Sequence, residues 1–193
     1  MVDSRSNTGL WGRRLWLIGF FCLICLPVLK AQHVALKTNT LYWMAGGSTN
    51  LEAEVALGRK TSLSLLGVYN PWTFKDDKMM HFAVVQPALK FWFCERFEGH
   101  FVGIHVHGAQ FYGDLMGYAD SRYDGYLAGA GISWGYDWIL GKHWNMEFEI
   151  GAGINYTWYK RSDCVPCRKY TGLDMHKTFV SPTKVSLSFV YLL

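Results

Sequence analysis

The sequence predicts an all-β protein, an eight-stranded antiparallel up-and-down transmembrane β-barrel located in a bacterial outer membrane. Three observations lead to this fold class: an N-terminal export signal, eight segments in which apolar and polar residues alternate, and connections that alternate between short and long. The composition agrees, because half of the 193 residues are hydrophobic and only 18% are charged. An ordinary soluble domain carries about 25% charged residues.

The N-terminus has the pattern of a cleaved secretory signal peptide. Arginines precede an apolar run from Leu15 to Leu29, and Ala31 supplies the small residue expected before a cleavage site. The alternative is a retained membrane anchor, but the run is shorter than the roughly 20 apolar residues of a spanning helix, and Pro27 interrupts it. We expect residues 1–31 to be removed and residues 32–193 to form the outer-membrane barrel.

Alternation with a period of two recurs through the mature chain, as in strands that bury one face. In one segment Leu51, Ala53 and Val55 share a face that is opposed by Glu52 and Glu54. Several segments reach the roughly 9–11 residues that a tilted strand needs to cross a bilayer. The eight predicted segments are Val34–Tyr42, Leu51–Leu57, Leu63–Tyr69, Ala83–Phe93, Val102–Val106, Tyr126–Trp138, Met146–Trp158 and Val185–Leu193.

The connections between these segments alternate in length. Short turns follow the second, fourth and sixth segments, and longer polar stretches follow the third, fifth and seventh; only the first outer loop, 44–49, is short. Short inner turns and long outer loops are typical of bacterial outer-membrane barrels. The short turns are 58–60, 95–99 and 141–143, and the long stretches are 70–79, 111–124 and 160–177. This asymmetry predicts that both termini lie on the periplasmic side.

Alternation alone does not fix which face of the sheet points inward, so a soluble β-sandwich or lipocalin-like barrel with an apolar interior is the alternative. Two features favour a barrel whose apolar face points outward to lipid. Aromatic residues gather near strand ends on the apolar face, as at membrane interfaces; they are Tyr42, Tyr69, Phe91, Phe93, Tyr126, Trp138, Tyr156, Trp158 and Tyr191. Glycines on the polar face suit a narrow, crowded lumen; they are Gly129, Gly131, Gly135, Gly151 and Gly153.

The polar faces place acidic and basic side chains together in the predicted lumen. An eight-stranded barrel has an interior just wide enough to be filled by side chains, and buried charges must pair. We therefore predict a network that plugs the barrel rather than a diffusion pore. Its members are Lys37, Glu52, Glu54, Lys90, His105, His107, Asp137, Glu147, Glu149 and Lys184.

The strongest candidate for chemistry is the pair His105 and His107, whose spacing puts both rings on one face of a strand. Metal binding or general-base catalysis is one interpretation, and histidines that only satisfy a polar core are the other. A lipid A hydrolase would need its histidine on the lipid side, whereas the outward neighbours here are Val102, Ile104 and Val106. We therefore assign no catalytic residue, metal or cofactor, and keep a lipid-modifying enzyme or a small-ligand or metal-binding barrel as the alternative.

Cys164 and Cys167 form a CxxC motif in the longest predicted outer loop. Such a motif can be a redox pair, half of a metal site or a local disulfide, and His176 is a conceivable third metal ligand. In an oxidising compartment the disulfide is the favoured interpretation. Cys94 is predicted at the opposite end of the barrel and cannot join this motif.

The chain resembles a domain-of-unknown-function family of small Bacteroidota outer-membrane β-barrel proteins, some encoded near fimbrial genes. The resemblance rests on segments spread over nearly all of the mature chain: 35–39, 69–74, 91–97, 99–103, 128–138, the CxxC motif and 182–184. It implies an outer-membrane barrel with a role at the cell surface, and it supplies no catalytic residues.

These observations predict a non-enzymatic barrel that presents surface loops for a structural, adhesin-related or fimbria-related interaction. The expected partners are outer-membrane lipid and lipopolysaccharide, together with a surface protein or fimbrial component. Nucleic acid is excluded, because the net charge is only +4 and the basic residues form no cluster that could follow phosphates.

Overall fold

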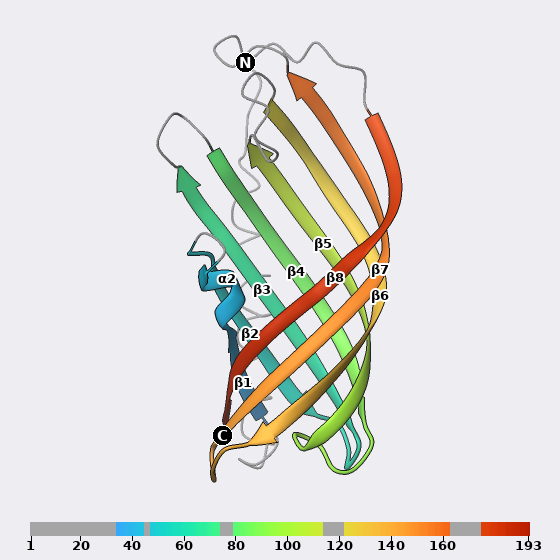
Figure 1. The fold of residues 1–193 in the computed structure, drawn as a ribbon. Helices are drawn as coiled ribbons and strands as arrows, with labels where there is room; N and C mark the ends of the chain where they lie inside the picture. The colour runs from blue at the N-terminus through green and yellow to red at the C-terminus, as the bar shows by residue number, and fades with distance from the viewer. Residues whose placement is uncertain (1–33, 45–46, 74–78, 114–121, 163–174) are drawn as a thin grey trace, which may run out of the picture.

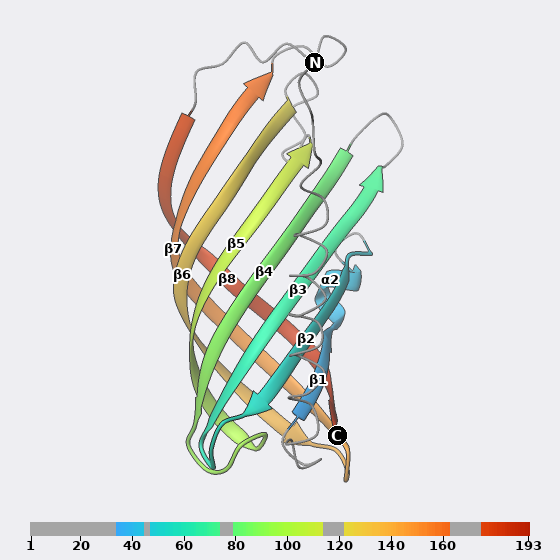
Figure 2. The same ribbon diagram turned by 180° about the vertical axis from the view of Figure 1, so that it is seen from behind.

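The computed structural model describes residues 34–44, 47–73, 79–113, 122–162 and 175–193. In this part of the chain eight antiparallel strands close into one barrel, in which each strand pairs with its neighbours in sequence and β8 returns to pair with β1. Figures 1 and 2 show the barrel from opposite sides, with the strands steeply tilted around a common axis. The predicted eight-stranded antiparallel architecture is confirmed.

The strands differ in length around the barrel. The first two have 6 and 8 residues, and the other six have between 13 and 19. The elements are β1 (Val34–Asn39), α2 (Thr40–Met44), β2 (Thr49–Ala56), β3 (Thr61–Thr73), β4 (Met79–Trp92), β5 (Gly99–Gly113), β6 (Arg122–Ile139), β7 (Trp144–Ser162) and β8 (Met175–Leu192).

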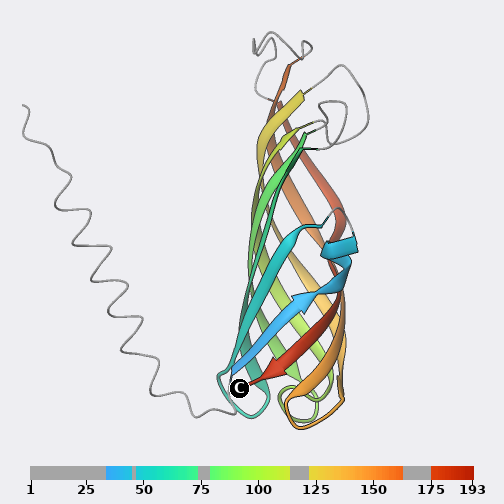
Figure 3. The ribbon, with the colours of Figure 1, turned by 90° about the vertical axis from the view of Figure 1, so that its left-hand side faces the viewer.

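The short connections 57–60, 93–98 and 140–143 lie together at one end of the barrel, which we call the turn end. The C-terminus is at this end as well (Figure 3), where the Leu193 amide donates to the Val34 carbonyl at 3.0 Å. The predicted long connections are too long, because the ladders on either side of them continue to the pairs Thr73–Met79, Gly113–Tyr123 and Tyr159–Met175. Polar residues in these stretches are therefore strand residues rather than loop residues.

The first strand is shorter than predicted, since β1 ends at Asn39 and Tyr42 lies in the short helix α2 rather than on a strand face. Asn39 stops the strand by capping this helix: its Oδ1 accepts from the amide of Leu41 at 3.0 Å. Asparagine is among the preferred N-cap residues, because its side chain satisfies an amide that has no partner within the helix. Alternation could not reveal this local hydrogen bond.

The inner face of the wall is polar and the outer face is apolar. Buried polar or charged residues of β1, β2, β4, β6, β7 and β8 point into the lumen, whereas large hydrophobic side chains are exposed on every strand. The alternative of an apolar interior is therefore wrong. One irregularity interrupts the alternation: Gly151 pairs with Lys184 but Ala152 pairs with Pro182, so Thr183 is an extra residue in β8.

The lumen ends in a small apolar cluster at the turn end, which we call the floor: Ala35, Trp92, Phe97, Phe101 and Val190. The rings of Phe97 and Phe101 lie 5.8 and 4.7 Å from that of Trp92. Phe97 comes from the β4–β5 turn and has a φ of 62°, a strained conformation for a bulky residue. Asn145 Nδ2 fixes it by donating to its carbonyl at 2.8 Å.

Among the described residues, no helix has the length and apolar character to cross a membrane.

Candidate functional site

Seven charged side chains occupy the lumen directly above the floor, and we call this set the charged layer: Lys37, Glu52, Glu54, Lys90, Glu147, Glu149 and Lys184. They come from β1, β2, β4, β7 and β8, so they are far apart in sequence and meet only because the sheet closes. All are buried, and none is more than 4% exposed. Seven of the ten predicted lumen residues are thus brought together in one layer.

Lys90 is the centre of the charged layer. Its Nζ lies 2.8 Å from Glu147, 3.0 Å from Glu149 and 3.4 Å from Glu54, with Glu52 at 3.7 Å. The same ammonium group lies 4.4 Å from the centre of the Phe101 ring. One cation therefore holds four carboxylates and rests on the aromatic floor through a cation–π contact.

The two outer lysines complete the pattern. Lys37 Nζ lies 2.6 Å from Glu54 and 2.5 Å from Glu147. Lys184 Nζ lies 3.1 Å from Glu52 and 3.0 Å from Glu149. Each glutamate therefore bridges Lys90 and one outer lysine, so no carboxylate in the layer depends on a single cation.

Neutral donors reinforce the carboxylates. Ser62 donates to Glu54 at 2.5 Å and itself accepts from the indole of Trp92 at 2.8 Å. Ser133 donates to Glu149 at 2.6 Å. Buried carboxylates need such additional hydrogen bonds to offset desolvation. Sequence reasoning missed these residues, because serine and tryptophan on an alternating strand carry no signal of a charged partner.

Asp137, predicted as part of this network, lies beside it without joining it. It is 1% exposed, and neither carboxylate oxygen has a hydrogen-bond partner among the described residues. Its partner across β6 and β7 is Glu147, another acid, whose oxygens are already held by Lys37 and Lys90. The acid is thus buried next to a like charge.

The histidines lie farther from the floor than the charged layer. His105 Nε2 is 2.8 Å from Thr183 Oγ1, and His107 Nε2 is 2.7 Å from Asn155 Oδ1. The Nδ1 atoms of both rings are buried without a hydrogen-bond partner in the described part of the chain. Because an amide oxygen only accepts, His107 carries its proton on Nε2 when neutral.

Glycines of β6 make room for these rings. A Cβ atom at Gly131 would lie 2.7 Å from His105 Nε2, and one at Gly129 would lie 2.6 Å from His107 Nε2. At Gly135 a Cβ atom would lie 2.3 Å from the ring of Phe101. Three of the glycines predicted to line a crowded lumen therefore lie directly against imidazole or phenyl rings: Gly129, Gly131 and Gly135. At Gly153 the nearest atoms are instead backbone atoms of Ala130 and Gly131.

The side chains of the lumen offer few groups for metal binding or catalysis. No group of three His, Cys, Asp or Glu side chains that could hold a metal is present among residues that the structure describes. The Thr183 hydroxyl beside His105 is a hydroxyl–imidazole pair, which sequence reasoning missed because alternation from Val185 puts Thr183 outside. The extra residue in β8 turns it inward.

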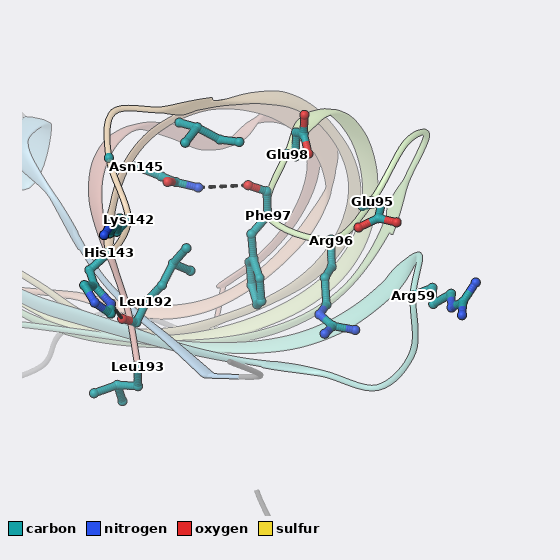
Figure 4. Close-up of a pocket in the computed structure, with 12 residues that line it drawn as sticks. Arg59, Glu95, Arg96, Phe97, Glu98, Lys142, His143, Asn145, Leu192 and Leu193 are labelled. Atoms are coloured by element: carbon teal, nitrogen blue, oxygen red, sulfur yellow. Dashed lines mark hydrogen bonds between the residues drawn. The ribbon is translucent and has the colours of Figure 1, made fainter. Parts of the chain in front are cut away.

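A cavity of about 740 Å³ opens at the turn end, below the lumen. Figure 4 shows Asn145 and Phe97 at its inner side, joined by their hydrogen bond, with charged side chains of the turns around it. Its lining includes Arg59, Arg96, Lys142, His143, Glu95 and Glu98. The cavity therefore reaches the floor at Phe97 from this side.

The cysteines divide between described and undescribed segments. Cys94 is exposed as a free thiol in the β4–β5 turn, at the turn end. Cys164 and Cys167 lie outside the described residues, and their disulfide stays a prediction. The same holds for the signal peptide, which falls within residues 1–33.

The model of a family described as protein of unknown function (DUF3575) matches residues 17–193, most of the chain. No curated protein and no solved structure matches the chain. The resemblance to a family of unknown function is confirmed, whereas the Bacteroidota and fimbrial context stays an expectation.

Proposed function

This chain belongs to the DUF3575 family of proteins of unknown function, and we propose that it is a non-enzymatic outer-membrane β-barrel with a closed lumen. In this proposal the barrel anchors the loops opposite the turn end for contact with a surface protein or fimbrial component. Outer-membrane lipid and lipopolysaccharide surround the wall.

The apolar outer wall carries this proposal. Large hydrophobic side chains are exposed on all eight strands, although the charged layer is inside. Monomeric soluble proteins rarely expose contiguous apolar patches larger than a few hundred Å². Closure supports the same conclusion, because lipid offers no partner for the amides and carbonyls of an open sheet edge. Members of this outer surface include Leu36, Leu51, Leu65, Val85, Ile104, Ile132, Ile154, Val180 and Phe189.

A matched pair of arginine substitutions tests the membrane location. Ile132, in the middle of β6, is 69% exposed, and Leu140, in the following turn, is 58% exposed. In a bilayer, Ile132→Arg is expected to cost about 2–4 kcal/mol, whereas a charge near the interface costs about 0–1 kcal/mol. We expect Ile132→Arg to deplete the protein from the outer-membrane fraction and Leu140→Arg to leave it there. Equal, normal yields of both variants in a soluble fraction would refute the location.

The closed lumen is tested by conductance. Lys90 and its four glutamates span the interior, and the floor lies below them. Purified protein in a planar lipid bilayer is expected to give no steady current. Large, stable channels would contradict the proposal.

Orientation is tested by thiol labelling of intact cells after mild reduction. A membrane-impermeant maleimide is expected to label Cys164 and Cys167 and to spare Cys94, which is at the turn end. Single-cysteine variants separate the signals. Labelling of Cys94 alone would reverse the proposed orientation and place the short turns outside.

The second candidate is a lipid-modifying enzyme, and the His105–Thr183 contact is the observation that favours it. A nucleophilic hydroxyl beside a general base is a recurring catalytic arrangement. Both groups face the lumen, however, and the outward neighbours of His105 are Ile104 and Val106. An acyl chain at the outer wall would have to cross the sheet to reach them, so we favour the interaction role.

A further inference from the structure

A pocket of about 430 Å³ lies on the outer wall near the start of β6 and the end of β7, opposite the turn end (Figure 1). The ladders place its outward side chains in two adjacent rows, so regular strands hold all of these groups. Asp124 and Lys160 are direct partners in one row. The other row crosses β5, β6, β7 and β8: Gln110, Tyr126, Trp158 and His176.

The side chains of this pocket combine aromatic, charged and amide groups. Tyr126 and Trp158 are 58% and 43% exposed, and aromatic rings at this level are expected of any barrel at a membrane interface. Their polar neighbours are not, since Lys160, Asp124 and Gln110 add an ammonium group, a carboxylate and an amide. Lysine binds phosphate as a point charge, aromatic faces pack against sugar rings, and carboxylate and amide groups bind hydroxyls. The pocket therefore suits a phosphorylated sugar.

Lys160 and His176 are the donors that a phosphate would meet. Both adjoin Trp158, because Lys160 lies two residues farther along the same face of β7 and His176 is the partner of Trp158 on β8. The ring of His176 is nearly parallel to that of Tyr156, with 6.3 Å between the ring centres. Asp124 lies opposite Lys160, but an ammonium group has three donors. Lys160 can therefore hold this carboxylate and a phosphate oxygen together.

An apolar groove of about 550 Å³ lies farther down the same side of the wall, on β5, β6 and β7. Beside it Ala152 pairs with Pro182 at the irregularity of β8, and such a bulge bends its strand. The outward residues of β6 between the pocket and the groove are Ala128 and Ala130, so no large side chain of β6 separates the two. Outward side chains that line the groove include Ile104, Ile132, Trp134, Ile150, Ala152 and Pro182.

The pocket and the groove are separated by the depth of one membrane leaflet. Ile132 in the groove lies six residues beyond Tyr126 in the pocket along β6. Six residues of strand span about 20 Å, and a strand tilt of about 40° reduces this to about 15 Å along the membrane normal. Half of the hydrocarbon core is also about 15 Å. A lipid of a single leaflet therefore reaches from the pocket to the groove.

We propose that this side of the barrel binds one molecule of lipid A, the phosphorylated and acylated glycolipid of lipopolysaccharide. Its sugar packs against Tyr126 and Trp158, its phosphate accepts from Lys160 and His176, and one acyl chain lies in the groove. The inference rests on the proposed membrane location and orientation, which put the pocket in the outer leaflet. Surrounding lipid is as apolar as the groove, so the headgroup supplies most of the selectivity.

The test is binding of purified bisphosphorylated lipid A to the mature protein refolded in a zwitterionic detergent, followed by native mass spectrometry over a titration. The wild type is expected to hold one molecule. The double variant Lys160→Gln/His176→Gln is expected to bind at least about tenfold more weakly, because one hydrogen bond to a charged group contributes that factor. Lys142→Gln/His143→Gln removes the same two groups at the turn end and is expected to keep the wild-type affinity.

A second pair of variants tests the groove. Ala152→Phe fills it and is expected to weaken lipid A binding by about threefold, a smaller effect because only packing contacts are lost. Ala53→Phe is the matched control, since Ala53 is exposed on the outer wall of β2, away from the groove. Its affinity is expected to equal that of the wild type.

Equal affinity of the wild type and Lys160→Gln/His176→Gln for lipid A would overturn the site. Equal binding of phosphatidylglycerol, which has a phosphate and acyl chains but no sugar, would overturn the choice of lipid A. Fractionation of cells separates these results from the proposed function. A wild type found in the outer-membrane fraction that binds no lipid A refutes the site alone, whereas a wild type found in the soluble fraction refutes the location on which the site depends.

Discussion

The charged layer and the histidine pair occupy the same lumen but are held in different ways. In the charged layer every glutamate contacts two lysines, and Lys90 contacts four carboxylates. His105 and His107 each have one partner through Nε2 and none through Nδ1 among the described residues. The comparison indicates that the charged layer supports the fold, whereas each histidine of the pair keeps one ring nitrogen without a protein partner among the described residues.

The largest effect is expected from removing the shared cation. Lys90→Met keeps most of the volume but leaves four glutamates with fewer cations, and breaking a buried ion pair costs about 3–5 kcal/mol. Urea unfolding in detergent micelles measures this loss. Lys142→Met, at an exposed turn position, is the control and should change the free energy of unfolding by less than about 0.5 kcal/mol. If both variants were equally stable, the charged layer would not support the fold.

A smaller effect is expected from filling the space beneath a histidine. In Gly131→Ala the new Cβ would lie 2.6 Å from the Ala152 carbonyl oxygen and 2.7 Å from His105 Nε2 and Thr183 Oγ1. Overpacking of this kind costs about 1–3 kcal/mol. Gly108, also on a strand, has nothing within 4 Å of its Cβ position, so Gly108→Ala is the matched control in the same unfolding assay. An unchanged stability of Gly131→Ala would mean that the ring of His105 lies elsewhere.

Replacing the histidines themselves should cost less. In His107→Gln the glutamine amide can still donate to Asn155 Oδ1, so the loss is expected to be about 1 kcal/mol or less, the net contribution of one hydrogen bond. His105→Gln is expected to behave similarly toward Thr183. Equilibrium unfolding of the single and double variants checks both values. A loss comparable to that of Lys90→Met would erase the distinction between the two regions.

The smallest expected effect is on lipid chemistry, where the proposed function predicts none. Lipid A is extracted from cells that lack the protein, contain it, or contain the His105→Gln/His107→Gln variant, and its acyl chains are compared by mass spectrometry. Loss of a catalytic base typically lowers turnover by about 10²-fold or more. An acyl-chain difference that depends on the wild-type histidines would establish the enzyme in place of the interaction role.

Much of the fold and of the lumen could be predicted because both depend on a period of two. Glu52 and Glu54 share a face in the sequence, and they share the lumen in the structure. Features that depend on local geometry could not be predicted in this way. The hydrogen bond by which Asn39 caps α2 ends β1 earlier than predicted. The extra residue in β8 turns the side chain of Thr183 from the outer face to the lumen. Phe97 packs in the floor although it comes from a turn.

The alternation of apolar and polar residues also could not predict that Asp137 is separate from the charged layer. Alternation places it with Glu147, and the ladder does pair the two. Whether an acid meets a lysine depends on side-chain reach across the barrel, which one strand cannot reveal. The same limit applies to Ser62 and Ser133, whose partners Glu54 and Glu149 lie on neighbouring strands.

The seam between β1 and β8 has a consequence for assembly. Lys37 is on β1 and Lys184 is on β8, and the two strands pair only over the short stretch from Ala35–Leu192 to Asn39–Ser188. Lys37 reaches Glu147 across 110 residues of chain, and Lys184 reaches Glu52 across 132. Neither contact can form in an open sheet.

In a partly assembled barrel Lys37 can still meet Glu54 on the adjacent strand β2, and Lys184 can meet Glu149 on β7. Glu147 and Glu52, however, would each lack an outer lysine. The Lys37–Glu147 and Lys184–Glu52 contacts form only when the first and last strands meet, so part of the electrostatic stabilisation comes at the final step of folding. The charged layer thus couples synthesis of the last strand to closure of the barrel. A barrel that stays open, or a truncated chain that lacks β1 or β8, is destabilised because these ion pairs cannot form.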